Sequence, residues 1–137
     1  GLVPAANGSL LTLTSSGNLD SINPATGVTT LIGPTGLADC SLTTSRCGPT
    51  SANALGGLGG TVYATDFNGD LYTVNPLTGA AKLIGSTGIP AVPAIPFTTN
   101  SDGSINFFDE NLFAAGGKLY ANFDAATFNP ELRWQPR

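Results

Sequence analysis

The sequence predicts an all-β fold made of antiparallel sheets of about four strands. Two observations predict it: one segment occurs twice, and no part of the chain shows a sustained helical period. Residues 17–37 (GNLDSINPATGVTTLIGPTGL) align without a gap with residues 69–89 (GDLYTVNPLTGAAKLIGSTGI), and 11 of the 21 positions are identical. Self-similarity at a period near 50 residues is typical of proteins assembled from repeated structural units.

Each copy of the repeat predicts a β-hairpin. A short strand runs into the pentapeptide Asn-Pro-x-Thr-Gly, and a second strand follows and stops at a glycine. Proline presets φ at the second position of a turn, and glycine supplies the positive φ that closes it. The predicted strands lie at 19–23 and 28–32 in the first copy, and at 71–75 and 80–84 in the second.

A third strand is predicted before each hairpin, at 9–13 and 61–65, and again at 118–122. A fourth is expected around 104–108 or 111–115, because the segments 53–60 and 111–117 also align with one another. The chain is therefore predicted to form a single β-repeat region over residues 1–137. We expect unit one at about 8–58, unit two at about 59–115 and a partial unit three at about 116–137.

Adjacent apolar residues in the predicted strands indicate sheets that are covered on both faces. Leu31 and Ile32 are neighbours, as are Leu83 and Ile84. Neighbouring residues of a strand point to opposite faces, so each pair places one apolar side chain on either side. A sheet with one face in water would show cleaner alternation.

The composition excludes several classes of function. The chain has five basic and nine acidic residues, a formal net charge of −4 and only 10% charged residues. Binding to nucleic acid needs a basic stripe, which so few lysines and arginines cannot form. No apolar run approaches the roughly 20 residues that span a bilayer, so no membrane insertion is expected. A polar but weakly charged surface favours a secreted or cell-surface location, and the absence of methionine indicates a longer product of translation.

Cys40 and Cys47 bracket the segment CSLTTSRC. A zinc site needs further ligands, but the chain has no histidine and no third cysteine. A redox motif normally has a closer Cys-x-x-Cys spacing. We therefore predict a local disulfide between Cys40 and Cys47, with two free thiols as the alternative, and a disulfide would place the protein in an oxidising compartment.

The local motif resembles the blade signature of secreted bacterial β-propeller repeat proteins, which is similar to LYTIDPATG. It occurs as GDLYTVNPLTG at 69–79 and GNLDSINPATG at 17–27, and its start occurs as GKLYA at 117–121. The resemblance implies β-propeller-like blades of about four strands. Propellers close with about four to eight blades, so two units and part of a third imply an incomplete ring within this chain. Such a ring implies partners: other copies of the chain, or missing blades of a longer polypeptide.

Two candidate sites contain acidic side chains that could carry chemistry. Asp66, Asn68 and Asp70 alternate in the segment DFNGD and could offer oxygen ligands to calcium, although the pattern favours a hairpin turn with acidic flanks. Asp109 and Glu110 form an acidic pair, which the end of a strand also explains. Calcium is the one candidate cofactor. Without histidine, nucleophilic catalysis of the serine or cysteine type lacks its usual base, so no enzyme is predicted.

A glycan is a further candidate partner. The aromatic side chains could form a binding shelf, although Tyr63 and Tyr120 hold equivalent places in the repeat, which also favours blade packing. The candidate shelf residues are Tyr63, Tyr72, Tyr120, Phe107, Phe108 and Trp134. Asn7 begins the segment Asn-Gly-Ser, which fits the N-glycosylation pattern.

The predicted function is a non-enzymatic, extracellular β-propeller-type repeat module that serves binding or scaffolding. The alternative is a structural subunit of a self-assembling extracellular filament, completed by exchange of strands or blades between copies. A third interpretation is a fragment of a propeller enzyme whose catalytic residues lie elsewhere.

Overall fold

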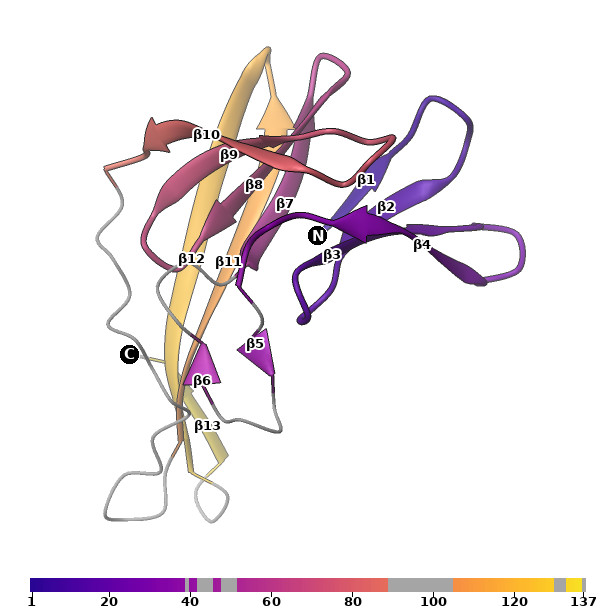
Figure 1. Ribbon diagram of the computed structural model, residues 1–137. Helices are drawn as coiled ribbons and strands as arrows, with labels where there is room; N and C mark the ends of the chain where they lie inside the picture. Colours follow the sequence, from indigo (N-terminus) through magenta and orange to yellow (C-terminus); the bar gives the residue numbers. More distant parts are fainter. Residues whose placement is uncertain (39, 42–45, 48–51, 89–104, 130–132, 137) are drawn as a thin grey trace.

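A computed structural model describes residues 1–38, 40–41, 46–47, 52–88, 105–129 and 133–136, and no helix occurs among them (Figure 1). All the strand pairs in this part of the chain are antiparallel. The prediction of an all-β fold with antiparallel sheets of four strands is therefore confirmed.

Two sheets have four strands each, and their strands follow one another in chain order. The first sheet contains β1 (Leu2–Pro4), β2 (Leu10–Leu13), β3 (Asn18–Ile22) and β4 (Thr29–Pro34). The second contains β7 (Ala52–Leu58), β8 (Thr61–Asp66), β9 (Asp70–Val74) and β10 (Ala81–Ser86). A third sheet contains β11 (Ile105–Ala115), β12 (Lys118–Asn129) and β13 (Arg133–Pro136).

The first two sheets have the same register in three of their four strands. Each cross-strand pair of β2–β3 and β3–β4 reappears in β8–β9 and β9–β10 with every residue number raised by 52. Examples are Leu10↔Ile22 with Val62↔Val74, and Leu19↔Gly33 with Leu71↔Gly85. A bulge interrupts both outer ladders at the same place. The repeated sequence thus forms the same local structure twice.

The sheets are divided differently from the predicted units. β7 pairs with β8 and β11 pairs with β12, so the expected fourth strand begins a sheet instead of ending the preceding unit. The physical reason is a two-residue turn of positive-φ glycines, Gly59–Gly60 and Gly116–Gly117, which joins each pair as a tight hairpin. β11 is one long strand that covers both candidate positions for the fourth strand, and β13 adds a strand that the sequence did not predict.

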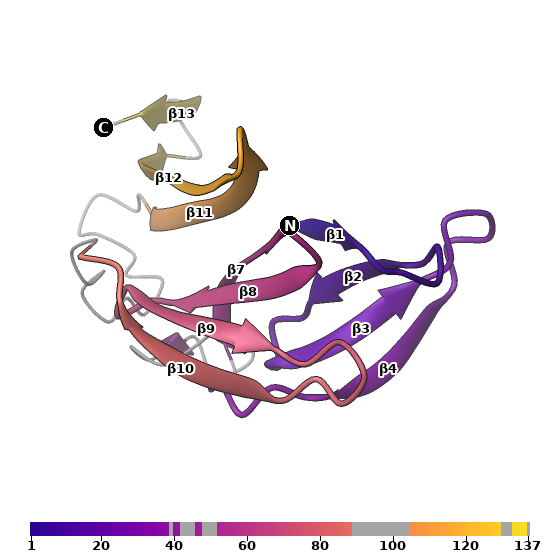
Figure 2. The same ribbon diagram turned by 90° about the horizontal axis from the view of Figure 1, so that it is seen from above.

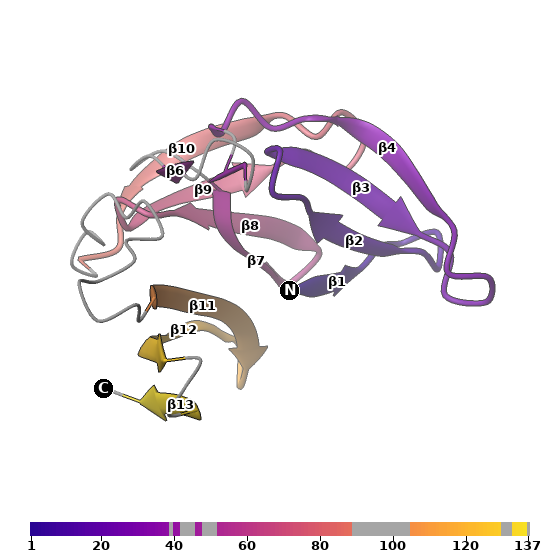
Figure 3. The same cartoon turned by 90° about the horizontal axis from the view of Figure 1, so that it is seen from below.

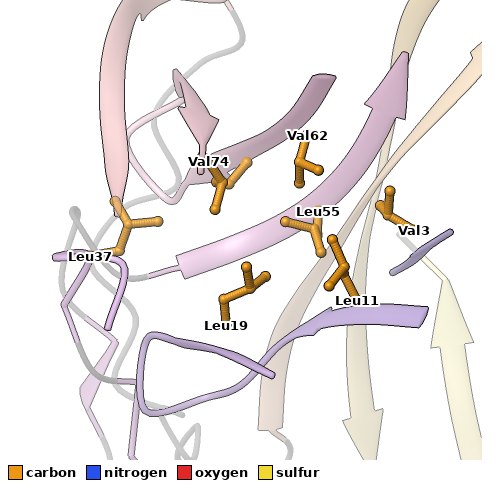
Figure 4. Packing of buried hydrophobic residues seen from close by; sticks show 8 residues of the cluster. Val3, Leu11, Leu19, Leu37, Leu55, Val62 and Val74 are labelled. Atoms are coloured by element: carbon orange, nitrogen blue, oxygen red, sulfur yellow. The ribbon is translucent and has the colours of Figure 1, made fainter. Parts of the chain in front are cut away.

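The main core lies between the first two sheets. Figure 4 shows apolar side chains of both sheets pointing toward one another in this space. Leu11 and Leu19 come from the first sheet, and Leu55, Val62 and Val74 from the second; all five are at most 5% exposed. Burying such side chains stabilises a fold by roughly 1.5–3 kcal/mol each.

At the outer strands, the two faces of each sheet are not completely buried. Leu31 of β4 is 61% exposed, and Leu83 and Ile84 of β10 are 55% and 56% exposed. The expectation that both faces of the sheets are covered is therefore wrong at these positions. β4 and β10 are edge strands of their sheets, and in this chain the side chains at these positions have too few neighbours to bury them.

The two sheets are also joined at their outer edges. The backbone amide of Ala81 donates a hydrogen bond of 2.9 Å to the carbonyl oxygen of Thr35, which follows β4. Thr35 is buried, and both its amide and its hydroxyl donate to the carbonyl of Gly17, at 2.9 and 2.6 Å. The backbone of Gly33 lies directly against Gly79, in the Asn-Pro-x-Thr-Gly turn of the second sheet. We call these contacts the outer junction.

The two cysteines lie in a separate two-stranded sheet of β5 (Cys40–Ser41) and β6 (Arg46–Cys47). The backbone register pairs Cys40 with Cys47. Their side chains lie outside the part of the chain that the structure describes, so the disulfide stays a prediction. Among the described residues, no helix is long and apolar enough to cross a membrane.

Candidate functional site

A pocket of about 650 Å³ opens where the first strands of the three sheets meet. Figures 2 and 3 show β1, β7 and β11 nearest to one another, with β4 and β10 at the far edges of their sheets. Strand β7 packs against both β1 and β11. The pocket is lined by residues 2–6 with Leu11, by residues 56–62 with Pro76, and by residues 112–114. Each of the three sheets thus contributes to one pocket.

The chemistry of this pocket is apolar. Its lining contains leucine, valine, proline, alanine, glycine and phenylalanine, and Thr61 is the one lining residue with a polar side chain. None of the lining side chains is titratable. Such a pocket recognises an uncharged apolar group by shape, with backbone amides and carbonyls as the available polar partners.

An exposed aromatic pair includes one residue of the pocket wall, Phe113. Phe113 and Tyr120 face one another across β11 and β12, with ring centroids 5.5 Å apart and ring planes 16° apart. They are 48% and 44% exposed. Stacked aromatic rings in water offer a flat apolar surface to a partner. The sequence prediction included Tyr120 and missed Phe113, although the Gly116–Gly117 turn implies that these two residues are cross-strand neighbours.

The other aromatic residues of the predicted shelf do not stack with this pair in the described part of the chain. Tyr72 instead uses its hydroxyl in a hydrogen bond to Asp66. The side chains of Phe107, Phe108 and Trp134 lie outside the described part. The glycan shelf therefore stays a prediction.

Asp66 organises the turn between β8 and β9. Its carboxylate is fully buried, and its Oδ1 accepts hydrogen bonds from the backbone amides of Asn68 and Asp70, both at 3.0 Å. Its Oδ2 accepts a hydrogen bond of 2.9 Å from the hydroxyl of Tyr72. The Asn68 side-chain amide donates to Asp70 Oδ2 at 3.2 Å. The three candidate calcium ligands are thus linked to one another and to the turn.

Thr14 has the same role in the first sheet. Its Oγ1 accepts the backbone amide of Asn18 at 3.1 Å, as Asp66 accepts the amide of Asp70. A hydroxyl and a carboxylate therefore close equivalent turns, which favours the structural interpretation of DFNGD. In the described residues no group of three or more His, Cys, Asp or Glu side chains could hold a metal ion. The calcium site stays a prediction, and the side chains of Asp109 and Glu110 lie outside the described part.

The candidate glycosylation site is an exposed turn. Asn7 Oδ1 accepts hydrogen bonds from the amide and the hydroxyl of Ser9, at 3.0 and 2.6 Å. Glycosylation of Asn7 stays a prediction.

The Tyr72 hydroxyl makes stability depend on pH in the alkaline range. Burial raises the pKa of Tyr72 to about 12, and the hydrogen bond to Asp66 and the negative charges of Asp66 and Asp70 act in the same direction. An unfolded tyrosine has a pKa near 10, so the folded state holds this proton more tightly. The stabilisation is complete below about pH 10 and is lost as the pH rises through about 12.

We therefore expect the melting temperature of the wild type to fall between about pH 10 and 12. In Tyr72→Phe, the part of this fall that comes from deprotonation of Tyr72 should be absent. In the same variant, an alkaline titration followed by tyrosinate absorbance should lack the step at the highest pH. An unchanged titration of Tyr72→Phe would contradict the assignment.

No family model matches this sequence, and a search of curated proteins gave no significant match.

Proposed function

We propose that this chain is a non-enzymatic, extracellular repeat module of the β-propeller type, which serves binding or scaffolding. The observation that carries the proposal is the shared register of the first two sheets, which pack face to face around a common core. In propellers, four-stranded sheets stand around a central axis with their first strands innermost. The arrangement of β1, β7 and β11 supports this interpretation.

The binding role rests on the pocket at the inner strands. In a propeller-type arrangement this pocket lies at the axis, where three sheets each supply part of the wall. Its apolar lining suits an uncharged group, such as an aliphatic or aromatic part of a partner molecule. The alternative role as a filament subunit is supported by apolar side chains that remain exposed at the two ends of the series of sheets.

Binding of an uncharged apolar dye such as Nile red tests the pocket. We expect saturable binding to the wild-type chain and its loss in Ala114→Trp, because Ala114 is exposed and lines the pocket, so the indole would fill it. The matched control is Ala115→Trp, at an exposed neighbour that does not line the pocket.

Retention of binding by the control supports the proposal. Equal loss in both variants, or no saturable binding to the wild type, would contradict a binding role for this pocket.

A further inference from the structure

Two further hollows lie beside the pocket at the inner strands, which we now call the inner pocket. The middle hollow, of about 460 Å³, is bordered by Leu11 and Ser21 of the first sheet and by Pro76 and Leu77 of the second. The outer hollow, of about 540 Å³, is bordered by residues 7–9 and by β3, β4 and the turn between them. Both hollows therefore involve the first sheet.

The three cavities form one groove along a single face of the first sheet. Leu11 and Pro76 line both the inner pocket and the middle hollow. Ser9 and Ser21 line both the middle and the outer hollow. Ser9 alternates with Leu11, and Leu11 is paired with Ser21, so these side chains share one face of the sheet. We call the three cavities together the first-sheet groove.

The chemistry of the groove changes from its inner to its outer end. The cross-strand row Val3↔Leu11↔Ser21↔Thr30 runs across the sheet from β1, the innermost strand, to β4 at the far edge (Figure 2). Val3 and Leu11 are buried, Ser21 is half-buried and Thr30 is exposed. The inner pocket has apolar walls, whereas most residues of the outer hollow have amide or hydroxyl side chains. The groove is thus amphipathic along its length.

Two asparagines of the outer hollow offer hydrogen-bond donors. Asn7 Oδ1 accepts from the amide and the hydroxyl of Ser9, and Asn23 Oδ1 accepts from the backbone amides of Ala25 and Thr26, at 2.9 and 3.3 Å. These bonds orient both side chains and occupy their oxygen atoms. Neither Nδ2 group has a hydrogen-bond partner within the described residues. Both groups are therefore available to the oxygen atoms of a ligand.

The groove has no charged side chain in its walls. Asp20, the one charged residue in the segment 1–38, is adjacent to Ser21 in β3 and therefore lies on the opposite face. In the second sheet, the place of Thr30 is taken by Lys82, which is paired with Thr73. An ionic head group would find no counter-charge in the first-sheet groove, whereas a hydroxyl both donates and accepts hydrogen bonds and matches amides and hydroxyls.

We propose that the first-sheet groove binds an uncharged amphiphile, with an aliphatic chain in the inner pocket and a sugar-like, polyhydroxylated head in the outer hollow. This proposal rests on the binding function proposed above and names the ligand class of that site. Adjacent strands lie about 4.8 Å apart, so the distance from β2 to β4 is about 10 Å. An extended chain of eight carbons covers a span of this order, so an octyl glycoside reaches both ends of the groove.

Isothermal titration with n-octyl β-D-glucoside, below its micelle-forming concentration, tests the proposal. We expect it to bind at least about 10-fold more tightly than octanol, which lacks the sugar, and than octyl sulfate, which carries an anionic head. Glucose alone should bind far more weakly, because it lacks the apolar chain. Lengthening the chain from hexyl to octyl should raise the affinity roughly fourfold for each CH₂ group.

Thr30→Trp should remove the advantage of the glucoside over octanol, because the indole fills the outer hollow. Thr29→Trp is the matched control: Thr29 is an equally exposed neighbour on β4 that points to the opposite face and lines none of the three cavities. It should bind the glucoside as the wild type does. Ala114→Trp should weaken the binding of both octanol and the glucoside, since both place their chain in the inner pocket. Circular dichroism establishes that each variant is folded.

Equal binding of octyl sulfate and the glucoside, or equal losses in Thr29→Trp and Thr30→Trp, would overturn the proposal. Nile red binding to the same samples separates this inference from the proposed function. A wild-type chain that binds the dye saturably but binds the glucoside no more tightly than octanol rejects the sugar-like head alone. A wild-type chain that binds neither the dye nor the glucoside rejects both the pocket function and the ligand class.

Discussion

Replacing Gly79 with alanine is expected to destabilise the protein by about 2–5 kcal/mol, whereas Gly27→Ala should cost only about 1–2 kcal/mol. The two glycines hold the same place in the repeat, and both have positive φ, +83° and +73°. The cost of the left-handed backbone is therefore common to both. A Cβ on Gly27 would meet no atom within 4 Å, but a Cβ on Gly79 would stand 2.8 Å from the carbonyl carbon of Gly33. The difference between the variants reports the outer junction.

Urea unfolding of both variants measures this difference in the free energy of unfolding. Gly8→Ala is a further control, because Gly8 has a φ of +85° and open space around it, and it should resemble Gly27→Ala. Equal destabilisation by Gly79→Ala and Gly27→Ala would mean that the second turn does not pack on β4 in solution.

Asp66→Ala is expected to lower the free energy of unfolding by about 2–4 kcal/mol. The change removes the acceptor of two backbone amides and of the Tyr72 hydroxyl in a place without access to water. Asp66→Asn should cost less, because the amide oxygen still accepts from both backbone amides. Asp66→Thr should also cost less than alanine, since Thr14 closes the equivalent turn with its hydroxyl.

Chemical denaturation of the three variants ranks them, and Asp70→Ala provides a control in the same turn. If alanine and asparagine at position 66 were equally tolerated, the turn hydrogen bonds would not be what stabilises this hairpin. Melting with calcium or with a chelator tests the other interpretation. A calcium-dependent rise in melting temperature that Asp66→Asn abolishes would establish the calcium site.

The hairpins of the first two sheets could be predicted from the sequence to within two residues. The Asn-Pro-x-Thr-Gly turn fixes where one strand stops and the next begins, as in β9 and β10. The division into sheets could not be predicted in the same way. β1 has three residues, and β7 is shifted by one residue in register relative to it, so the 52-residue repeat does not extend to the first strand. The two copies of the repeat are most similar toward the outer edge of each sheet. Which strands belong to a sheet is instead decided by the hairpin of its first two strands, at the inner edge.

The candidate site was less accessible to sequence reasoning because it is assembled from distant segments. The pocket brings together residues near positions 3, 57 and 113, and nothing in their local pattern differs from that of other apolar strands. The candidate calcium ligands, in contrast to the pocket residues, have a local sequence pattern that stands out. Their alternation suggested a metal site, but the burial of Asp66 and its bond to Tyr72 depend on tertiary packing.

The central claim is that the repeated sheets pack on one another through a defined junction. The scalar coupling across a hydrogen bond, measured by NMR between the amide nitrogen of Ala81 and the carbonyl carbon of Thr35, tests it most directly. Packing as described here predicts a measurable coupling and slow exchange of the Ala81 amide with solvent. An Ala81 amide that exchanges freely and shows no coupling to Thr35 would contradict it.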